Sequence, residues 1–233
     1  MRGVLLTALV SGLFAGLVFF GVQSVTTRSL IAQAEVYEQA ELPVAPPMQT
    51  DVSHQHEWEP RDGIERAAYT LAADVLIGVG YAFLLVGAVS TSGRAITTGS
   101  GMAWGAAGFV VFVVAPSLGL PPEPPGGHAA ELLSRQIWWL GAACATAAGL
   151  WLLLMQRRGW LRVAGVALLV VPHVIGAPRL TDAGVETHGE LIRQFMWASF
   201  AANAALWAAL GLAVGQLYPW STRVAARSFG ARA

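Results

Sequence analysis

The feature that most constrains this chain is a series of six apolar runs separated by short polar segments. A helix needs roughly 20 apolar residues to cross a bilayer, within a range of about 17–25. The fifth run is the weakest, because Arg162 and Pro172 shorten it. The runs cover residues 4–25, 67–89, 103–120, 137–155, 163–175 and 195–217. We therefore predict an all-α membrane bundle of six transmembrane helices, with residues 1–233 as one integral-membrane domain.

The composition agrees with a surface that faces lipid. Of the 233 residues, 55% are hydrophobic and only 12% are charged, whereas soluble domains carry about 25% charged residues. The net charge is zero, which argues against nucleic-acid binding, since that usually requires a basic stripe. The single cysteine, Cys144, excludes a multi-cysteine metal centre within this chain.

The distribution of charge predicts the orientation. Arginine is enriched in cytoplasmic loops. With six spans and a cytoplasmic N-terminus, the inner segments contain eight arginines and no acidic residue, while the outer segments contain thirteen of the fourteen acidic residues. We therefore expect a multi-pass protein of the bacterial inner membrane with both termini in the cytoplasm.

The first run has a second interpretation. Arg2, the apolar stretch and Ala32-Gln33-Ala34 together resemble a signal peptide and its cleavage site. However, the run exceeds the 7–15 residues typical of a cleaved segment, so a retained span is favoured.

An internal repeat suggests three two-helix hairpins of the same orientation. Glu131 with Arg135-Gln136 opens one span, and Glu190 with Arg193-Gln194 opens another. Glu65-Arg66 is a fainter copy before the second run. Repeats of shared orientation occur in transporter folds. Alternatively, any helix that enters a membrane from outside has an acidic first turn and an aromatic belt residue.

The predicted outer loops contain most of the metal-capable side chains. The loop over residues 26–66 is acidic, and in an extended segment residues two apart lie on one side. Imidazole with carboxylate suits zinc, copper, iron, nickel or cobalt. Glu123 and His173 lie beside two proline breaks. The candidate metal ligands are His54, His56, Glu57, Glu59, Asp62, Glu123 and His173. The alternative is ordinary solvation of acidic loops.

Within the membrane, Asp74 is the outstanding residue. A charge at the centre of a span costs about 2.5–3.5 kcal/mol on insertion scales. Counted from the arginine that opens each helix, Asp74, Cys144 and Asn203 lie at similar depth. They are candidates for a translocation path, or for hydrogen bonds that hold the bundle together. Gly12 and Gly16 predict close helix packing, either within the chain or with another subunit.

Four segments in order resemble the CbtA family of predicted cobalt transporters. They are residues 54–66 (HQHEWEPRDGIER), 115–123 (APSLGLPPE), 135–139 (RQIWW) and 172–178 (PHVIGAP). The resemblance implies cobalt import for vitamin B12 synthesis, together with CbtB, a small single-span partner with a histidine-rich tail. The family is usually described with five spans, whereas the charge distribution here favours six.

Two functional classes follow from these observations. The first is a membrane subunit of a divalent-metal uptake system, with cobalt, nickel or zinc as the transported ion and no permanently bound cofactor. The second is a non-transporting membrane scaffold or metal-sensing subunit. No phosphate-binding loop and no nucleophile–histidine arrangement is present in the sequence, so we do not expect an enzyme. A homo-oligomer is compatible with either class.

Overall fold

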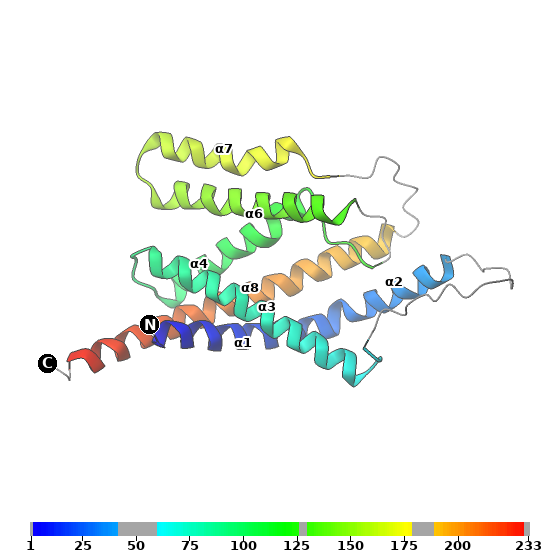
Figure 1. The fold of residues 1–233 in the computed structure, drawn as a ribbon, viewed down its shortest axis with the longest axis horizontal. Helices are drawn as coiled ribbons and strands as arrows, with labels where there is room; N and C mark the ends of the chain where they lie inside the picture. The colour runs from blue at the N-terminus through cyan, green and yellow to red at the C-terminus, as the bar shows by residue number, and fades with distance from the viewer. Residues whose placement is uncertain (1, 42–59, 126–129, 179–188, 231–233) are drawn as a thin grey trace.

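The computed structural model describes residues 2–41, 60–125, 130–178 and 189–230. Within these ranges the chain forms helices and no strand (Figure 1). The elements are α1 (Arg2–Thr26), α2 (Arg28–Glu41), α3 (Ile64–Thr91), α4 (Thr98–Phe109), the π-helix η1 (Val110–Val114), α5 (Ala115–Ser117), α6 (Leu132–Met155), α7 (Gly159–Ile175) and α8 (Gly189–Gly230). The prediction of an all-helical protein is confirmed.

Five helical segments of the described chain are long and apolar enough to cross a membrane. They are Gly3–Thr26, Ile64–Thr91, Thr98–Ser117, Leu132–Met155 and Gly189–Arg223. The sixth predicted span corresponds to α7, a shorter apolar helix of 17 residues. At 1.5 Å per residue it is roughly 26 Å long, slightly less than the ~30 Å hydrocarbon core. Six spans are therefore not confirmed, because α7 is shorter than each of the five candidate membrane spans.

The contact between α1 and α3 is made through glycine. A Cβ atom placed on Gly12 would lie 2.4 Å from Val79 Cα, and one on Gly78 would lie 2.5 Å from the Gly12 carbonyl oxygen. A Cβ atom on Gly16 would lie 2.7 Å from the Asp74 carbonyl oxygen. The predicted close packing of Gly12 and Gly16 is thus found, and its partner is α3 of the same chain. Small residues let helix backbones approach closely where lipid supplies no hydrophobic driving force.

Two further helix pairs also pack through glycine. On α4, a Cβ on Gly101 would lie 2.5 Å from Gly215 Cα of α8, and one on Gly211 would lie 2.7 Å from the Gly101 carbonyl oxygen. Gly149 of α6 and Gly165 of α7 face each other in the same way. A Cβ atom on Gly149 would lie 2.8 Å from the Gly165 carbonyl oxygen, and one on Gly165 would lie 2.9 Å from the Gly149 carbonyl oxygen. In three helix pairs the two backbones are therefore in direct contact.

The arrangement of the helix pairs differs from three consecutive hairpins. In Figure 1, α6 and α7 lie side by side at one edge of the bundle, and α1 and α3 lie together at the opposite edge. The main packing partner of α7 is α6, whereas α8 packs against α1 and α4. The hairpin repeat is therefore not confirmed.

Glu131 and Glu190, the acidic residues of the predicted repeat, have different local roles in the two helices. Glu131 caps α6, because its carboxylate accepts hydrogen bonds from the backbone N–H groups of Leu133 and Ser134. The Ser134 hydroxyl also donates to it, and these bonds lower the pKa of Glu131. The cap is therefore complete above the ordinary carboxyl pKa and weakens as pH falls through the lowered value. Glu190, in contrast, lies in the first turn of α8 and pairs with Arg193 and Gln194.

A proline break produces the irregular turn between α4 and α5. Pro116 has no N–H to donate, and its ring crowds the carbonyl four residues earlier. The chain passes through the π-helical turn of η1 directly before it, which is one known accommodation of such a conflict. Here Phe112 is held in the core, where its ring stacks on Trp207 with centroids 5.5 Å apart and planes 6° from parallel.

The glycine contact between α1 and α3 gives a direct stability test. Gly78→Ala would place a methyl group against the backbone of α1, and overpacking of this kind costs about 1–3 kcal/mol. We expect a lower thermal unfolding midpoint in detergent. Gly80→Ala is the matched control, because a Cβ at Gly80 meets nothing within 4 Å. Equal thermal unfolding midpoints for Gly78→Ala and Gly80→Ala would contradict a direct backbone contact at Gly78.

Candidate functional site

A polar pocket of about 460 Å³ lies at one end of α3, where α1 passes into α2. Its wall comes from three segments: the end of α1, the first half of α2, and the start of α3 with the residues just before it. Its polar lining residues are Gln23, Ser24, Thr27, Arg28, Glu35, Asp62, Arg66 and Thr70. Charged and amide side chains therefore converge at one end of an otherwise apolar bundle.

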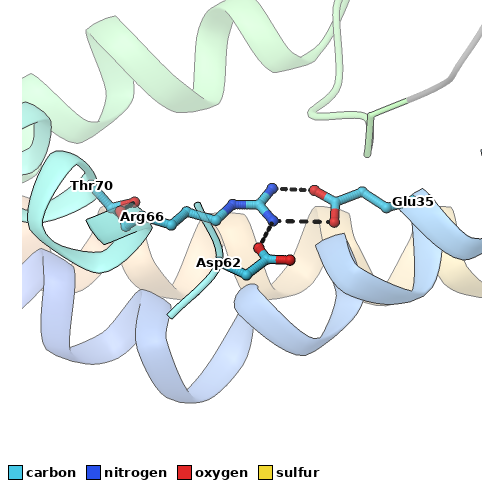
Figure 2. Close-up of polar contacts among 4 residues, drawn as sticks. All are labelled: Glu35, Asp62, Arg66 and Thr70. Atoms are coloured by element: carbon cyan, nitrogen blue, oxygen red, sulfur yellow. Dashed lines mark hydrogen bonds and ion pairs between the residues drawn. The ribbon is translucent and has the colours of Figure 1, made fainter. Parts of the chain in front are cut away.

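Arg66 is the centre of the ion pairs in this pocket. Its guanidinium donates to both carboxylate oxygens of Glu35, with the Nη1 to Oε2 distance at 3.3 Å. The same Nη1 donates to Asp62 Oδ1 at 3.0 Å. Figure 2 shows one guanidinium held between two carboxylates from different segments. The bidentate pair ties α2 to the start of α3.

Asp74 lies deeper, on the same helix. Its side chain is buried, with 4% of the residue exposed. Gln23 Nε2 donates to Asp74 Oδ1 at 3.1 Å, while Asp74 Oδ2 has no hydrogen-bond partner in the described part of the chain. Because Gln23 also lines the polar pocket, one side chain joins the pocket to the buried carboxylate. A neutral amide donor satisfies only part of what a buried carboxylate requires.

The register of the helices explains this alignment. Arg66, Thr70, Asp74 and Gly78 follow one another at four-residue spacing, so they lie on one face of α3. The opposing residues Gln23, Thr27, Ile31 and Glu35 have the same spacing and all line the pocket. The close contact at Gly12, Gly16 and Gly78 fixes the two faces against each other. Ion pair, pocket and buried carboxylate therefore follow a single line along the α1–α3 interface.

The predicted outer-loop ligands fall in two groups. His54, His56, Glu57 and Glu59 lie outside the described residues. Asp62 is described and lies at the pocket, where it pairs with Arg66. The first part of the expected outer loop is the helix α2, so residues 26–66 are not one irregular segment.

His173 lies in the last turn of α7, directly after Pro172, and Glu123 lies in the segment that follows α5. His173 is half-buried near the end of α7, and its ring meets the Trp138 ring edge-on with centroids 6.1 Å apart. A Cβ on Gly119 would lie 2.3 Å from the same Trp138 ring and 2.9 Å from Ala177 Cβ. Three of the four motifs that resemble the CbtA family thus meet around Trp138. Glu123 is exposed just beyond α5.

The three candidate path residues have different surroundings. Asp74 is buried between α1 and α3, as described above. Asn203 is half-buried on α8 and donates to the Ser199 carbonyl oxygen of its own helix at 2.9 Å. Cys144 is exposed on α6. No hydrogen bond joins these three residues, all of which lie in the described ranges, so their common path stays a prediction.

A compact metal site is not found in residues 2–41, 60–125, 130–178 and 189–230. In these ranges no three histidine, cysteine or carboxylate side chains come together as potential ligands. At the polar pocket, the two carboxylates that could bind an ion, Glu35 and Asp62, are both paired with Arg66. Any ion bound at the pocket would therefore compete with the Arg66 guanidinium.

Gln23, Glu35 and the central role of Arg66 were not predicted from the sequence. One signal was available, since Arg66 precedes Asp74 by eight residues, two steps of four on the same helix face. The other two residues were not accessible in this way, because their roles depend on the register between α1–α2 and α3.

Removal of the guanidinium tests how the pocket is held. We expect Arg66→Gln to release α2 from α3 and to increase hydrogen exchange of the α2 backbone amides. Only the Arg66–Glu35 pair joins α2 to α3, and an exposed ion pair contributes about 0.2–1 kcal/mol, so its loss should raise exchange by up to about fivefold. Arg61→Gln is the control, because Arg61 pairs with Glu65 outside the pocket lining. Unchanged protection of α2 in Arg66→Gln would show that the ion pairs do not hold it.

Comparison with known families identifies the chain. Residues 1–219 match the CbtA family, which is described as a probable cobalt transporter subunit. No curated protein and no solved structure matches the chain. The word subunit implies a partner in a complex, and the several long apolar helices agree with a multi-pass membrane protein. The matched region takes in every motif noted in the sequence, and we conclude that this chain belongs to the CbtA family of probable cobalt transporter subunits.

Proposed function

We propose that this chain is the membrane subunit through which a divalent metal, cobalt in the first place, enters the cell to supply cobalamin synthesis. The observation that carries the proposal is the pairing of Asp74 with the polar pocket. A buried carboxylate with one unpartnered oxygen is costly within a membrane bundle, and such residues mark ion pathways. Gln23 connects this carboxylate to the pocket.

The proposed entrance is the pocket between α1–α2 and α3. His54 and His56, with Glu57 and Glu59, collect the ion in the outer loop and pass it to Asp62. Glu35 and Asp62 then offer two carboxylates, but Arg66 bonds both of them. A dication must displace the guanidinium before it approaches Gln23 and Asp74. Arg66 would therefore act as a resident cation that keeps the entrance closed to weakly bound ions.

Beyond Asp74 the α1–α3 interface is closed by backbone contact at Gly12, Gly16 and Gly78. Passage past this point requires either separation of α1 from α3 or a lateral step toward another helix. Asn203 on α8 and Cys144 on α6, predicted at a depth similar to that of Asp74, are the proposed polar residues for the lateral step. Glu123 and His173 are proposed as a second ligand pair at the proline breaks.

The membrane potential is a sufficient driving force for this reaction. Movement of one charge across the membrane yields about 2.3 kcal/mol per 100 mV, and a dication gains twice that on entering a negative interior. The sequence contains no phosphate-binding loop, so we assign no nucleotide hydrolysis to this chain and regard it as a non-enzyme. The orientation with both termini in the cytoplasm of a bacterial inner membrane belongs to the same proposal.

A partner is part of the proposal. A small single-span protein of the CbtB type, with a histidine-rich tail, would deliver or receive the ion. A homo-oligomer is compatible with the same proposal, and exposed apolar residues of neighbouring copies would meet in it.

The alternative function is a non-transporting membrane scaffold or a metal-sensing subunit. The observation in its favour is that the described carboxylates at the pocket are paired with arginine and form no three-ligand cluster. In that case Asp74 and Gln23 form a structural hydrogen bond between helices, and a change at Asp74 alters assembly with the partner.

Cobalt uptake in cells distinguishes the two functions. The chain is expressed with its small partner in a strain that lacks other cobalt importers. We expect Asp74→Asn to reduce uptake by at least tenfold at unchanged protein level, since it removes the only buried charge described within the spans. Glu65→Gln is the control, because Glu65 lies on the same helix outside the pocket lining.

The second arm of this experiment tests capture in the outer loop. The double variant His54→Ala/His56→Ala should raise the cobalt concentration at half-maximal uptake and leave the maximal rate nearly unchanged. Full uptake by Asp74→Asn, or altered partner assembly without any uptake by the wild type, would contradict transport and favour the scaffold.

A further inference from the structure

A second cavity, separate from the polar pocket, lies between α3, α4 and α6. Its volume is about 490 Å³. It is lined by the second half of α3, the α3–α4 turn, most of α4, part of η1, the second half of α6, and Trp207 of α8. Small side chains such as Ala103 and Ala147 form part of the wall and are exposed there. Along its length this groove is apolar.

The polar members of the lining lie at the end of the groove near the α3–α4 turn. They are Arg94 and Ser100. Arg94 is exposed, and its Nη2 donates to the Leu154 carbonyl oxygen at 3.2 Å. Arg157 and Arg158, both exposed, lie two and three residues after the lining residue Met155. No acidic residue occurs in segments 90–98 and 155–163, so this end of the groove is strongly positive.

The dimensions of the groove restrict what can occupy it. From Ser100 to Phe112, both of which line it, a helix rises roughly 18 Å, more than half of the ~30 Å hydrocarbon core. A volume of about 490 Å³ along that length describes a narrow, elongated groove. A single hydrocarbon chain matches this shape, whereas a transmembrane helix, about 10–12 Å in diameter, is wider than the groove.

We infer that this groove is a binding site for an anionic phospholipid, with one acyl chain along α4 and the phosphate at Arg94. A guanidinium pairs with phosphate through two parallel hydrogen bonds, and Arg94 uses only one of its nitrogens for Leu154. Basic pockets between membrane helices favour anionic headgroups. The cluster of arginines disfavours the cationic choline group of a zwitterionic lipid.

Tryptophan fluorescence reports occupation of the groove, because three of the nine tryptophans, Trp104, Trp151 and Trp207, line it. The exposed Trp160, Trp197 and Trp220 are quenched by bulk lipid, so only a saturable phase is assigned to the groove. The full chain is reconstituted in phosphatidylcholine bilayers with increasing mole fractions of phosphatidylglycerol brominated on its acyl chains, since bromine quenches a tryptophan that it touches. A parallel titration uses brominated phosphatidylcholine. We expect a saturable phase of quenching with phosphatidylglycerol at a lower mole fraction than with phosphatidylcholine.

Two variants separate the headgroup from the acyl chain. Arg94→Gln should raise the half-saturating fraction of phosphatidylglycerol by about tenfold, as expected for loss of a charge-assisted contact. The control is Arg223→Gln, because Arg223 also bonds a backbone carbonyl and lies outside the groove. Ala103→Leu/Ala147→Leu should abolish the saturable phase by filling the groove. Ala106→Leu is its control, an exposed α4 residue that does not line the groove.

The outcome does not depend on one variant. Equal quenching by the two brominated lipids, or an unchanged half-saturating fraction in Arg94→Gln, would overturn the inference. So would a saturable phase that survives in a folded Ala103→Leu/Ala147→Leu protein. Size-exclusion profile and thermal unfolding check the fold of each variant. If the filled variant does not fold, the headgroup comparison and Arg94→Gln still decide the result.

Discussion

Backbone contact through glycine is the constraint on which the arrangement of this bundle depends. In a membrane, apolar side chains gain little by leaving lipid for one another, so helix association rests on close packing and hydrogen bonds. Three helix pairs here meet where a single added Cβ atom would lie less than 3 Å from the opposing helix: α1 with α3, α4 with α8, and α6 with α7. These contacts fix both the depth and the rotation of each helix.

The α1–α3 contact also determines the candidate site. It places Gln23 opposite Asp74, and it places α2, which follows α1, opposite the start of α3. The polar pocket lies at one end of this contact, and the buried carboxylate of Asp74 lies beside it. The same closeness that defines the site closes the interface beyond Asp74, so the proposed transport requires motion of a tightly packed pair. The Arg66 ion pairs lie where such a motion would begin.

The sequence predicted the five candidate membrane spans to within about six residues at either end, because apolar length is a local property. The sixth predicted span is the shorter helix α7. It also singled out Asp74, since a charge in an apolar run is conspicuous without any knowledge of its neighbours. The helix α2 was missed, because its polar composition is equally typical of a loop. The partners of Gly12, Gln23 and Arg66 could not be predicted, since each depends on the register between separate helices. The repeated glutamate and Arg-Gln pairs mark where α6 and α8 begin. They did not predict which helices pack together, because α7 packs on α6 and not on α8.

The most direct test of the central claim is cobalt flux into proteoliposomes that contain the purified chain and its small partner, under an imposed potential that is negative inside. The proposed mechanism predicts that cobalt entry increases with the size of the potential and is lost in Asp74→Asn, while Glu65→Gln behaves as the wild type. Absence of flux through properly reconstituted wild-type protein, or flux that is unaffected by Asp74→Asn, would contradict a metal path along the α1–α3 interface.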